Sequence, residues 1–387
     1  STLLASSAAS DVYKRQTKDL LMAVPVDNTT GYSYQFQNFG KTSNRGIELS
    51  VNVDVINKGD FRFNVGAIYN YNRNKLDELP NADQYLYSSY WGSSSLVPTN
   101  DYMFVEGKAI GLVRGFISEG YYTVDDFNYT NGQYVLKEGV PDITKALTAT
   151  YMHPYDLPAG QTAFPGAAKF RDVDESGTVD LDDATCLGEV MPRHTGSFQL
   201  NFNYKNFDFS TNFNWTAGGK VYNVAAMINA SGQEFDGIGA QRASWVADAF
   251  KVYNVNAAGD LYAVTNPDEL RALNANAKYH LPYHQSGITS SEWLENGSYL
   301  RLQTLTLGYT LPKNWLTKVH VDKIRLYLTA TNLFTITGYS GIDPEVNANP
   351  TGQSGFYSDL RIFPTLNMDF GTYPRARTFT FGANITF

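Results

Sequence analysis

Cysteine is almost absent from this chain, since Cys186 is the only one among its 387 residues. A single cysteine cannot form an internal disulfide, which excludes a small disulfide-stapled secreted module. No base stands near Cys186 in a pattern typical of a catalytic nucleophile, so we interpret it as incidental. Phosphate-binding loops, dinucleotide fingerprints and nucleophile motifs are missing too. We therefore expect no enzyme activity.

Charge and long hydrophobic runs are also scarce. Charged residues make up 18% of the chain, whereas about a quarter is usual in soluble domains. The net charge of −8 argues against nucleic acid as a partner. No apolar run approaches the roughly 20 residues that a membrane helix needs. A transmembrane β-barrel remains open, because its lipid-facing residues are spread over alternate positions of each strand.

The start of the chain has a character of its own. Ser1–Gln16 begins with small and apolar residues but lacks the basic start and the long apolar core of a signal peptide. Within it, Asp11–Gln16 reads as the translation of the transposase end sequence used in preparing sequencing libraries. We expect residues 1–16 to be a sequencing-adapter or other non-native segment, and residues 17–387 to be the native chain.

Alternation of apolar and polar residues is the most frequent pattern in the chain, and it predicts β-strands with two different faces. In one such strand Phe198, Leu200 and Phe202 alternate with the polar residues between them. Strands of this kind are predicted at residues 47–54, 61–72, 198–204, 207–215, 299–311, 324–330 and 378–387.

Two details complete the strand prediction. The phase of the alternation changes inside residues 299–311, which predicts a β-bulge near Gln303 and Thr304. Weaker strands near 33–39, 101–106 and 110–119 bring the total to about ten.

The connections between the strands are of two kinds. Short turns lie at 55–60, 205–206 and 312–321, and long segments lie at 73–100, 120–195, 216–297 and 335–375. The two kinds alternate along the chain, as periplasmic turns and extracellular loops do in outer-membrane barrels. With 205–206 in the periplasm, every long segment falls outside and Phe387 ends in the periplasm. The sequence therefore predicts an all-β, antiparallel transmembrane β-barrel.

Several segments carry more specific motifs. The best are NGSYLRLQTLTLGYTLPKNWL at Asn296–Leu316, IRLYLTATNLFTITGYSGIDPEV at Ile324–Val346, and YPRARTFTFGANITF from Tyr373 to the end. Weaker ones lie at Asn44–Leu49, Glu106–Phe116 and Lys169–Asp183. Together these segments touch most of residues 17–387, and they resemble the SusC/RagA family of TonB-dependent outer-membrane transporters.

The resemblance implies that the chain is the C-terminal half of a barrel of about 22 strands around a plugged lumen. It implies uptake of oligosaccharides or peptides across the cell outer membrane, with a SusD-like lipoprotein as a lid. The plug domain is absent, so contact with the TonB complex would run through the missing N-terminal part. The rival interpretations are a soluble or surface-exposed carbohydrate-binding β-sandwich, and a siderophore receptor or porin-type barrel.

One acidic stretch, Asp172–Asp183, has the spacing of a calcium loop. The expected ligands of a structural Ca²⁺ are side chains of Asp172, Asp174, Ser176, Asp180 and Asp183 and the backbone carbonyl of Thr178. Gly177 stands where such a loop turns sharply. Asp183 replaces the usual glutamate and is shorter, and Asp180 would bind directly or through water. A solvated acidic turn is the alternative.

Two further features have ordinary explanations. His280 and His284 have the spacing of metal ligands on a helix, but Pro282 between them argues against a helix. Exposed loop imidazoles are therefore expected. The long segments also carry aromatic residues, which suit sugar or peptide binding but more often serve loop self-packing or a membrane-interface girdle. They are Tyr85, Tyr87, Tyr90, Trp91, Tyr121, Tyr122 and Tyr151.

Overall fold

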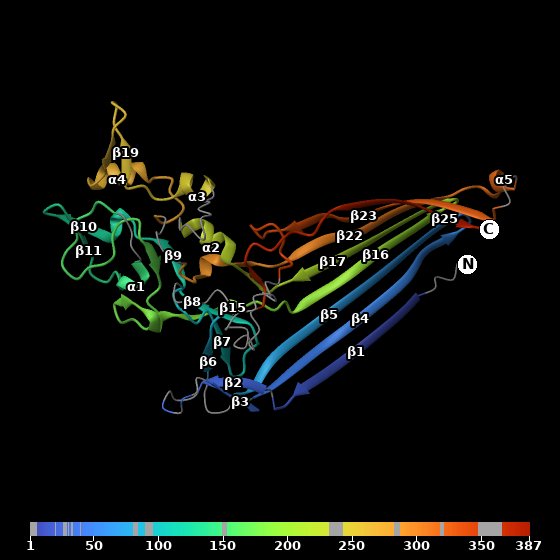
Figure 1. Cartoon of the computed structure of the whole chain (residues 1–387), viewed down its shortest axis with the longest axis horizontal. Helices are drawn as coiled ribbons and strands as arrows, with labels where there is room; N and C mark the ends of the chain where they lie inside the picture. Colours follow the sequence, from blue (N-terminus) through green and yellow to red (C-terminus); the bar gives the residue numbers. More distant parts are fainter. Residues whose placement is uncertain are drawn as a thin grey trace.

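A computed structural model of the chain has one large antiparallel sheet at one end and the long connections at the other (Figure 1). It describes residues 6–387 except 20, 26–28, 30, 32–33, 39, 80–83, 90–95, 149–152, 232–242, 282–286, 318–320 and 347–365. The described residues of 79–193, 218–298 and 338–377 are called the loop module below. No helix in the described residues is long and apolar enough to cross a membrane.

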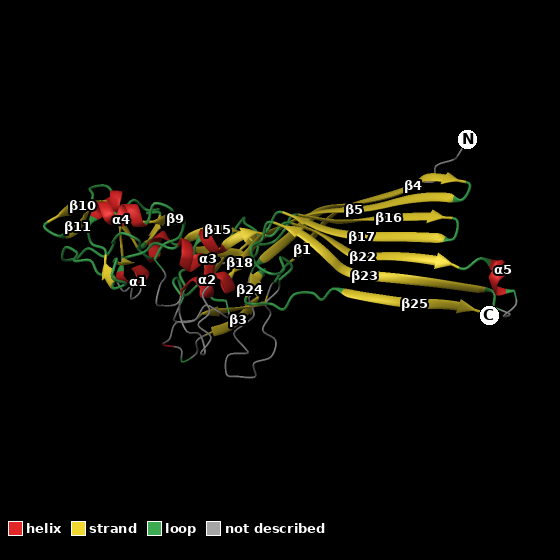
Figure 2. Ribbon diagram, turned by 90° about the horizontal axis from the view of Figure 1, so that it is seen from above, coloured by secondary structure: helices red, strands yellow, loops and turns green. Residues whose placement is uncertain are grey.

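Eight strands form the large sheet and lie side by side in chain order as a single layer (Figure 2). They are β1 (Ser6–Thr17), β4 (Lys41–Lys58), β5 (Phe61–Glu78), β16 (His194–Tyr204), β17 (Phe207–Ala217), β22 (Tyr299–Thr310), β23 (Lys323–Thr337) and β25 (Thr378–Thr386). The strands predicted by alternation are confirmed. The predicted bulge is also confirmed, because the register shifts between Leu302 and Thr304 and leaves Gln303 unpaired with either neighbouring strand.

The register of the large sheet gathers the apolar positions on one face. Phe198 of β16 lies between Ala67 of β5 and Phe213 of β17, and the row continues to Leu302 of β22. Successive side chains of a strand point to opposite faces, so Gln199 and its polar counterparts lie on the other face.

In the part of the chain that the structure describes, no second layer covers the apolar face. Leu49 and Leu307, both on inner strands, remain 41% and 45% exposed. In a β-sandwich two sheets bury their apolar faces against each other. The exposed apolar face therefore argues against the rival interpretation of a soluble sandwich.

The large sheet has eight strands and not the ten or so that the sequence predicts. The weaker strands are instead β3 (Tyr34–Asn38), which pairs with β2 (Leu21–Pro25), and β7 (Tyr102–Val105) and β8 (Leu112–Gly115), which belong to a small separate sheet. Four or five residues extend at most ~17 Å, too short for an apolar membrane band of about 25 Å. Ser6–Thr17, most of which belongs to the segment predicted to be non-native, forms the edge strand β1 against β4.

Short turns and long connections lie at opposite ends of the large sheet, as predicted. The turn between β4 and β5, the turn between β16 and β17, and the helix α5 (Lys313–Leu316) lie at the same end as the C-terminus (Figure 1). The loop module lies at the other end.

The long connections contain many short elements rather than irregular loops. The further strands are β6 (Gln84–Tyr87), β9 (Ser118–Tyr121), β10 (Phe127–Thr130), β11 (Gln133–Leu136), β12 (Asp142–Ile143), β13 (Ala168–Phe170), β14 (Thr178–Val179), β15 (Thr185–Glu189), β18 (Lys220–Asn223), β19 (Tyr253–Val255), β20 (Leu261–Ala263), β21 (Leu294–Asn296) and β24 (Met368–Asp369). The helices are α1 (Lys145–Thr148), α2 (Val224–Ser231), α3 (Ala243–Asp248) and α4 (Pro267–Leu273), with 3₁₀ turns η2 (Val124–Asp126), η3 (Leu181–Asp183) and η4 (Ser291–Trp293).

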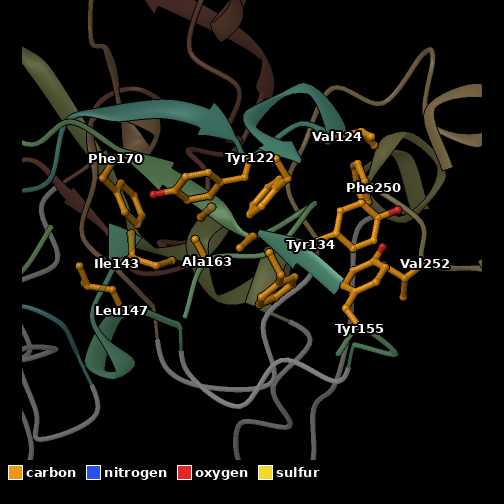
Figure 3. Close-up of a cluster of buried hydrophobic side chains, with 14 of the residues drawn as sticks. Tyr122, Val124, Tyr134, Ile143, Leu147, Tyr155, Ala163, Phe170, Phe250 and Val252 are labelled. Carbon is orange, nitrogen blue, oxygen red and sulfur yellow. The ribbon is translucent and has the colours of Figure 1, made fainter. Parts of the chain in front are cut away.

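Two large hydrophobic cores hold the described loop module together, beside a small third cluster of Val221, Tyr339 and Val346. The inner core joins buried residues of 76–113 to those of 222–230 and 293–294. The distal core joins buried residues of 116–179 to those of 250–288 (Figure 3). In each core, connections that are distant in the sequence pack against each other. The hydroxyl of Tyr134 also donates to the carbonyl of Thr265 at 2.9 Å, which links two connections across the distal core.

Candidate functional site

The acidic stretch Asp172–Asp183 connects β13 to β15 beside the distal core. Gly177 turns the chain with a φ of 86°, a left-handed conformation that glycine adopts at little cost. Val179 is buried in the distal core, and the parallel pairing of β14 with β12 sets Thr178 beside Asp142. The turn is therefore attached to the folded module on its C-terminal side.

Three carboxylates converge in this turn. The ligand oxygens of Asp172, Asp174 and Asp183 lie within 4.8 Å of one another. Backbone N–H groups hold them: Asp172 accepts from Gly177 at 2.7 Å, and Asp183 accepts from Asp180 at 2.8 Å. Asp183 is fully buried. Hydrogen bonds from Ser176 lower the pKa of Asp174, so this carboxylate stays charged to lower pH than usual.

The other three predicted ligands make different contacts. The hydroxyl of Ser176 donates to the carbonyl of Thr178 at 3.0 Å. Asp180 caps η3, where its carboxylate accepts from the N–H of Asp182 at 2.8 Å. Among the described residues, the structure thus brings together the carboxylates of Asp172, Asp174 and Asp183, and Ser176 lies beside them because its N–H donates to Asp172 at 3.1 Å and to Asp174 at 3.0 Å.

The chemistry of this cluster fits a hard cation such as Ca²⁺. All the candidate donors are oxygens, which is the ligand type that calcium takes. Carboxylates this close repel one another unless a cation or hydrogen bonds compensate. Backbone hydrogen bonds supply part of that compensation, as they would in a solvated acidic turn.

His280 is buried, so the expectation of an exposed imidazole was wrong. Its side chain is 2% exposed, and its ring meets Trp245 edge-on with centroids 5.3 Å apart. Burial lowers the pKa of His280 to about 4, and its Nε2 lies 3.8 Å from the carboxylate of Glu292. The favourable packing of the imidazole against aromatic side chains of the loop module outweighs the cost of removing this polar ring from water. His284 lies outside the described residues.

Comparison with known proteins shows which proteins this chain is similar to. No protein-family model matches it. It is 30% identical over 378 residues to TonB-dependent receptor P3 of Formosa agariphila, covering 97% of this chain and 32% of that receptor. It is 25% identical over 387 residues to TonB-dependent receptor SusC of Bacteroides thetaiotaomicron, covering 97% of this chain and 30% of that receptor. The chain is a homologue of the TonB-dependent receptors.

The chain spans about a third of the length of these TonB-dependent receptors. Among solved structures, the RagAB peptide transporter shares its fold with a TM-score of 0.65 at 21% identity. The match covers 99% of this chain and 33% of the RagAB chain. The closed-closed state of the RagAB peptide importer matches to the same extent. The predicted resemblance to the SusC/RagA family of TonB-dependent transporters is confirmed.

In this receptor homologue, the described loop aromatics are packing residues. Tyr87 is buried in the inner core and Tyr122 in the distal core, and Tyr85 and Tyr121 pack against the same cores. For these four residues the self-packing interpretation is confirmed. The remaining three, Tyr90, Trp91 and Tyr151, lie outside the described residues.

Sequence reasoning missed a buried ion-pair network where the large sheet meets the loop module. Arg301 of β22 is 2% exposed, and its guanidinium lies 2.5 Å from Asp343 and 3.2 Å from Glu345. Glu345 also pairs with Arg375 at 2.7 Å. The sequence offers one signal for this network. A charged residue stands between Leu300 and Leu302, where the alternation of apolar and polar residues changes phase.

Proposed function

We propose that this chain is the C-terminal part of an outer-membrane β-barrel that takes up nutrients in a TonB-dependent manner. The observation that carries the proposal is the continuous apolar face of the large sheet, with short turns at one end and a folded module at the other. Such a face suits contact with lipid, where backbone groups must be satisfied within the sheet. The homology to TonB-dependent receptors supports it.

The dimensions of the apolar face support a membrane-spanning role. On β4 the face is apolar from Ile47 to Ile56, which is roughly 30 Å along the strand. At a typical tilt of about 40° this spans ~23 Å, close to the apolar band of about 25 Å in outer-membrane barrels. Tyr69 and Trp215 lie near the loop-side end of the band, in the row of Leu49, with ring centroids 6.1 Å apart. Aromatic girdles of this kind mark membrane interfaces.

The missing parts of the receptor would complete the transporter. The edge strand β25 would pair with a strand outside this chain, and a native strand would take the place of β1 beside β4, so that a barrel of about 22 strands closes. A SusD-like lipoprotein would cover the loop module as a lid, and the TonB complex would act through the N-terminal part. The cargo would be oligosaccharides or peptides, and the similarity to the RagAB peptide importer keeps peptides among them.

The acidic turn adds a structural role to this proposal. Ca²⁺ held by Asp172, Asp174 and Asp183 would brace the turn against the distal core, with Ser176, Thr178 and Asp180 completing the ligand set. Calorimetry on the full-length receptor should detect Ca²⁺ binding that Asp172→Ala and Asp174→Ala abolish. Asp182→Ala, the control, removes a neighbouring carboxylate outside the predicted ligand set and should bind normally. If all variants bind alike, or none binds, the stretch is a solvated turn.

The proposed function itself is tested on the full-length receptor produced in a bacterial host with an outer membrane. It should fractionate with that membrane and require detergent for extraction. Together with its lid lipoprotein, it should support uptake of labelled oligosaccharides or peptides, and loss of the TonB complex should abolish that uptake. Recovery of the receptor from the soluble fraction would overturn the proposal, and comparison of the two cargo classes identifies the substrate.

A further inference from the structure

The apolar face of the large sheet ends in a row of cations on its loop side. Arg45 of β4 lies directly opposite Arg73 of β5, and both side chains are exposed. They lie on the same face as Ile47 and Tyr71, which form the next row of the sheet. Strand alternation puts Lys75 on this face as well. Lys14 of β1 also lies opposite Arg45, within the segment 1–16 that the sequence predicts to be non-native.

Among the described residues, neither guanidinium group forms a direct ion pair, and the nearby Asp77 interacts with Arg45 only at longer range. Like charges directly opposite each other destabilise an antiparallel pair. In the described part of the chain neither Arg45 nor Arg73 forms an ion pair, whereas the neighbouring Lys75 pairs with Asp77 at 3.5 Å. Arg193 nearby is likewise neutralised, by Glu189 at 2.6 Å. An external anion between Arg45 and Arg73 would relieve their repulsion.

The position of the row formed by Arg45 and Arg73 indicates the chemical class of anion that would bind there. The apolar band begins at Ile47, so Arg45 stands one step beyond its loop-side edge, at the level of lipid headgroups. Tyr71 and His194 pack together in the adjacent row with ring centroids 5.1 Å apart. Arginine forks match phosphate oxygens in a bidentate way. An amphiphile with acyl chains on the apolar band and a phosphate at its head complements both parts of this surface.

We propose that Arg45 and Arg73 bind the phosphate-bearing headgroup of a lipid in the outward-facing leaflet. The inference rests on the proposed function, since it requires the apolar face to contact a bilayer. It goes further by assigning a lipid site to two named residues on the outside of the sheet.

The chain offers a matched control on the same strand. Arg62 of β5 is exposed like Arg73, but the alternation of the strand puts it on the opposite, polar face. Arg73→Gln and Arg62→Gln therefore remove the same group from the same strand, but Arg62 lies on the other face and at the opposite end, beside the turn between β4 and β5. A basic residue near a membrane surface contributes about 1 kcal/mol to lipid binding, which is about fivefold in affinity.

The experiment uses the full-length receptor in detergent micelles and counts bound lipids by native mass spectrometry. The probes are phosphatidylglycerol and diacylglycerol with the same acyl chains. Arg73→Gln should weaken phosphatidylglycerol binding by about fivefold, and Arg45→Gln with Arg73→Gln by about 25-fold. Arg62→Gln should leave it within about twofold, and diacylglycerol should bind weakly to all forms.

Two results would overturn this assignment. One is equal loss of phosphatidylglycerol in Arg73→Gln and Arg62→Gln, or in neither. The other is displacement of the lipid by inorganic phosphate at equal concentration, which would make the row a general anion site. Both differ from failure of the proposed function. A receptor that fractionates with the outer membrane but shows either result refutes only the lipid site.

Discussion

At the scale of single residues, Asp101 is the most unusual group of the inner part of the loop module. It is fully buried and accepts from the N–H and the hydroxyl of Ser89 at 2.7 and 2.5 Å. Burial raises its pKa to about 6, against about 4 in an unfolded chain. The folded module therefore binds a proton that the unfolded chain releases, and its free energy of unfolding falls as the pH rises from about 4 to about 6.

Asp101→Asn should remove this pH dependence. The difference in free energy of unfolding between parent and variant should change by roughly 3 kcal/mol between pH 4 and pH 7. Burial also raises the pKa of Glu292 to about 7 and lowers that of His280 to about 4. Both groups remain in the variant, so the comparison cancels them. Hydrogen exchange of the loop module across this pH range measures the effect, and parallel pH profiles for both proteins would contradict it.

Arg301 gives a second prediction at this scale. Arg301→Ala leaves the carboxylate of Asp343 buried without its partner, which should cost about 3–5 kcal/mol. Arg375→Ala breaks the ion pair to Glu345, in which the side chain of Arg375 is 46% exposed. This loss should cost less than about 1 kcal/mol. Hydrogen exchange of residues 338–346 reads out both variants. Similar loosening in the two would mean that the buried pair does not anchor this segment.

At the scale of elements, the two faces of β16 should respond differently to charge. Leu200 lies on the apolar face, in a row with Val65 of β5 and Thr211 of β17. Leu200→Arg should cost roughly 2–4 kcal/mol in the membrane. Asn201 lies on the opposite face and donates to Asn64 at 3.4 Å, and Asn201→Arg should cost much less. Folding of the full-length receptor into lipid vesicles, titrated with urea, measures both. Equal costs would refute the assignment of faces.

The strands of the large sheet were predictable because a period of two residues is a property of the strand itself. The bulge at Gln303 followed from the same rule, since an extra residue reverses the phase. The short strands near 101–119 were misassigned to the large sheet because their pattern does not reveal which strand they pair with. β7 pairs with β6 and β8, and β8 also pairs with β15, so these strands form a sheet within the single connection between β5 and β16.

The candidate metal turn was predictable from spacing, and its hydrogen bonds were not. Asp172, Asp174 and Asp183 converge as expected, but the capping role of Asp180 depends on the 3₁₀ turn that follows it. The burial of His280 was not predictable either. It depends on Trp245, which is far from His280 in the sequence and stacks on Tyr279 in the fold.

At the scale of the whole molecule, the large sheet leaves two unpaired edges, β1 and β25, and an uncovered apolar face. Open edges and exposed apolar surface favour association between copies. The 387-residue chain on its own should therefore aggregate in aqueous buffer without detergent. Light scattering and size-exclusion chromatography check this. A monodisperse, cooperatively folding product in buffer would contradict the view that the sheet is part of a larger barrel.

The central claim is that the apolar face of the large sheet contacts lipid. Nitroxide labels placed one at a time from Phe198 to Asn203 of β16, in the full-length receptor in bilayers, test it most directly, with the exposed Cys186 replaced by serine. Phe198, Leu200 and Phe202 should be accessible to oxygen and protected from a water-soluble nickel reagent, because they face acyl chains. The residues between them should show lower oxygen accessibility. A profile without this two-residue alternation, or nickel access at Phe198, Leu200 and Phe202, would contradict the account.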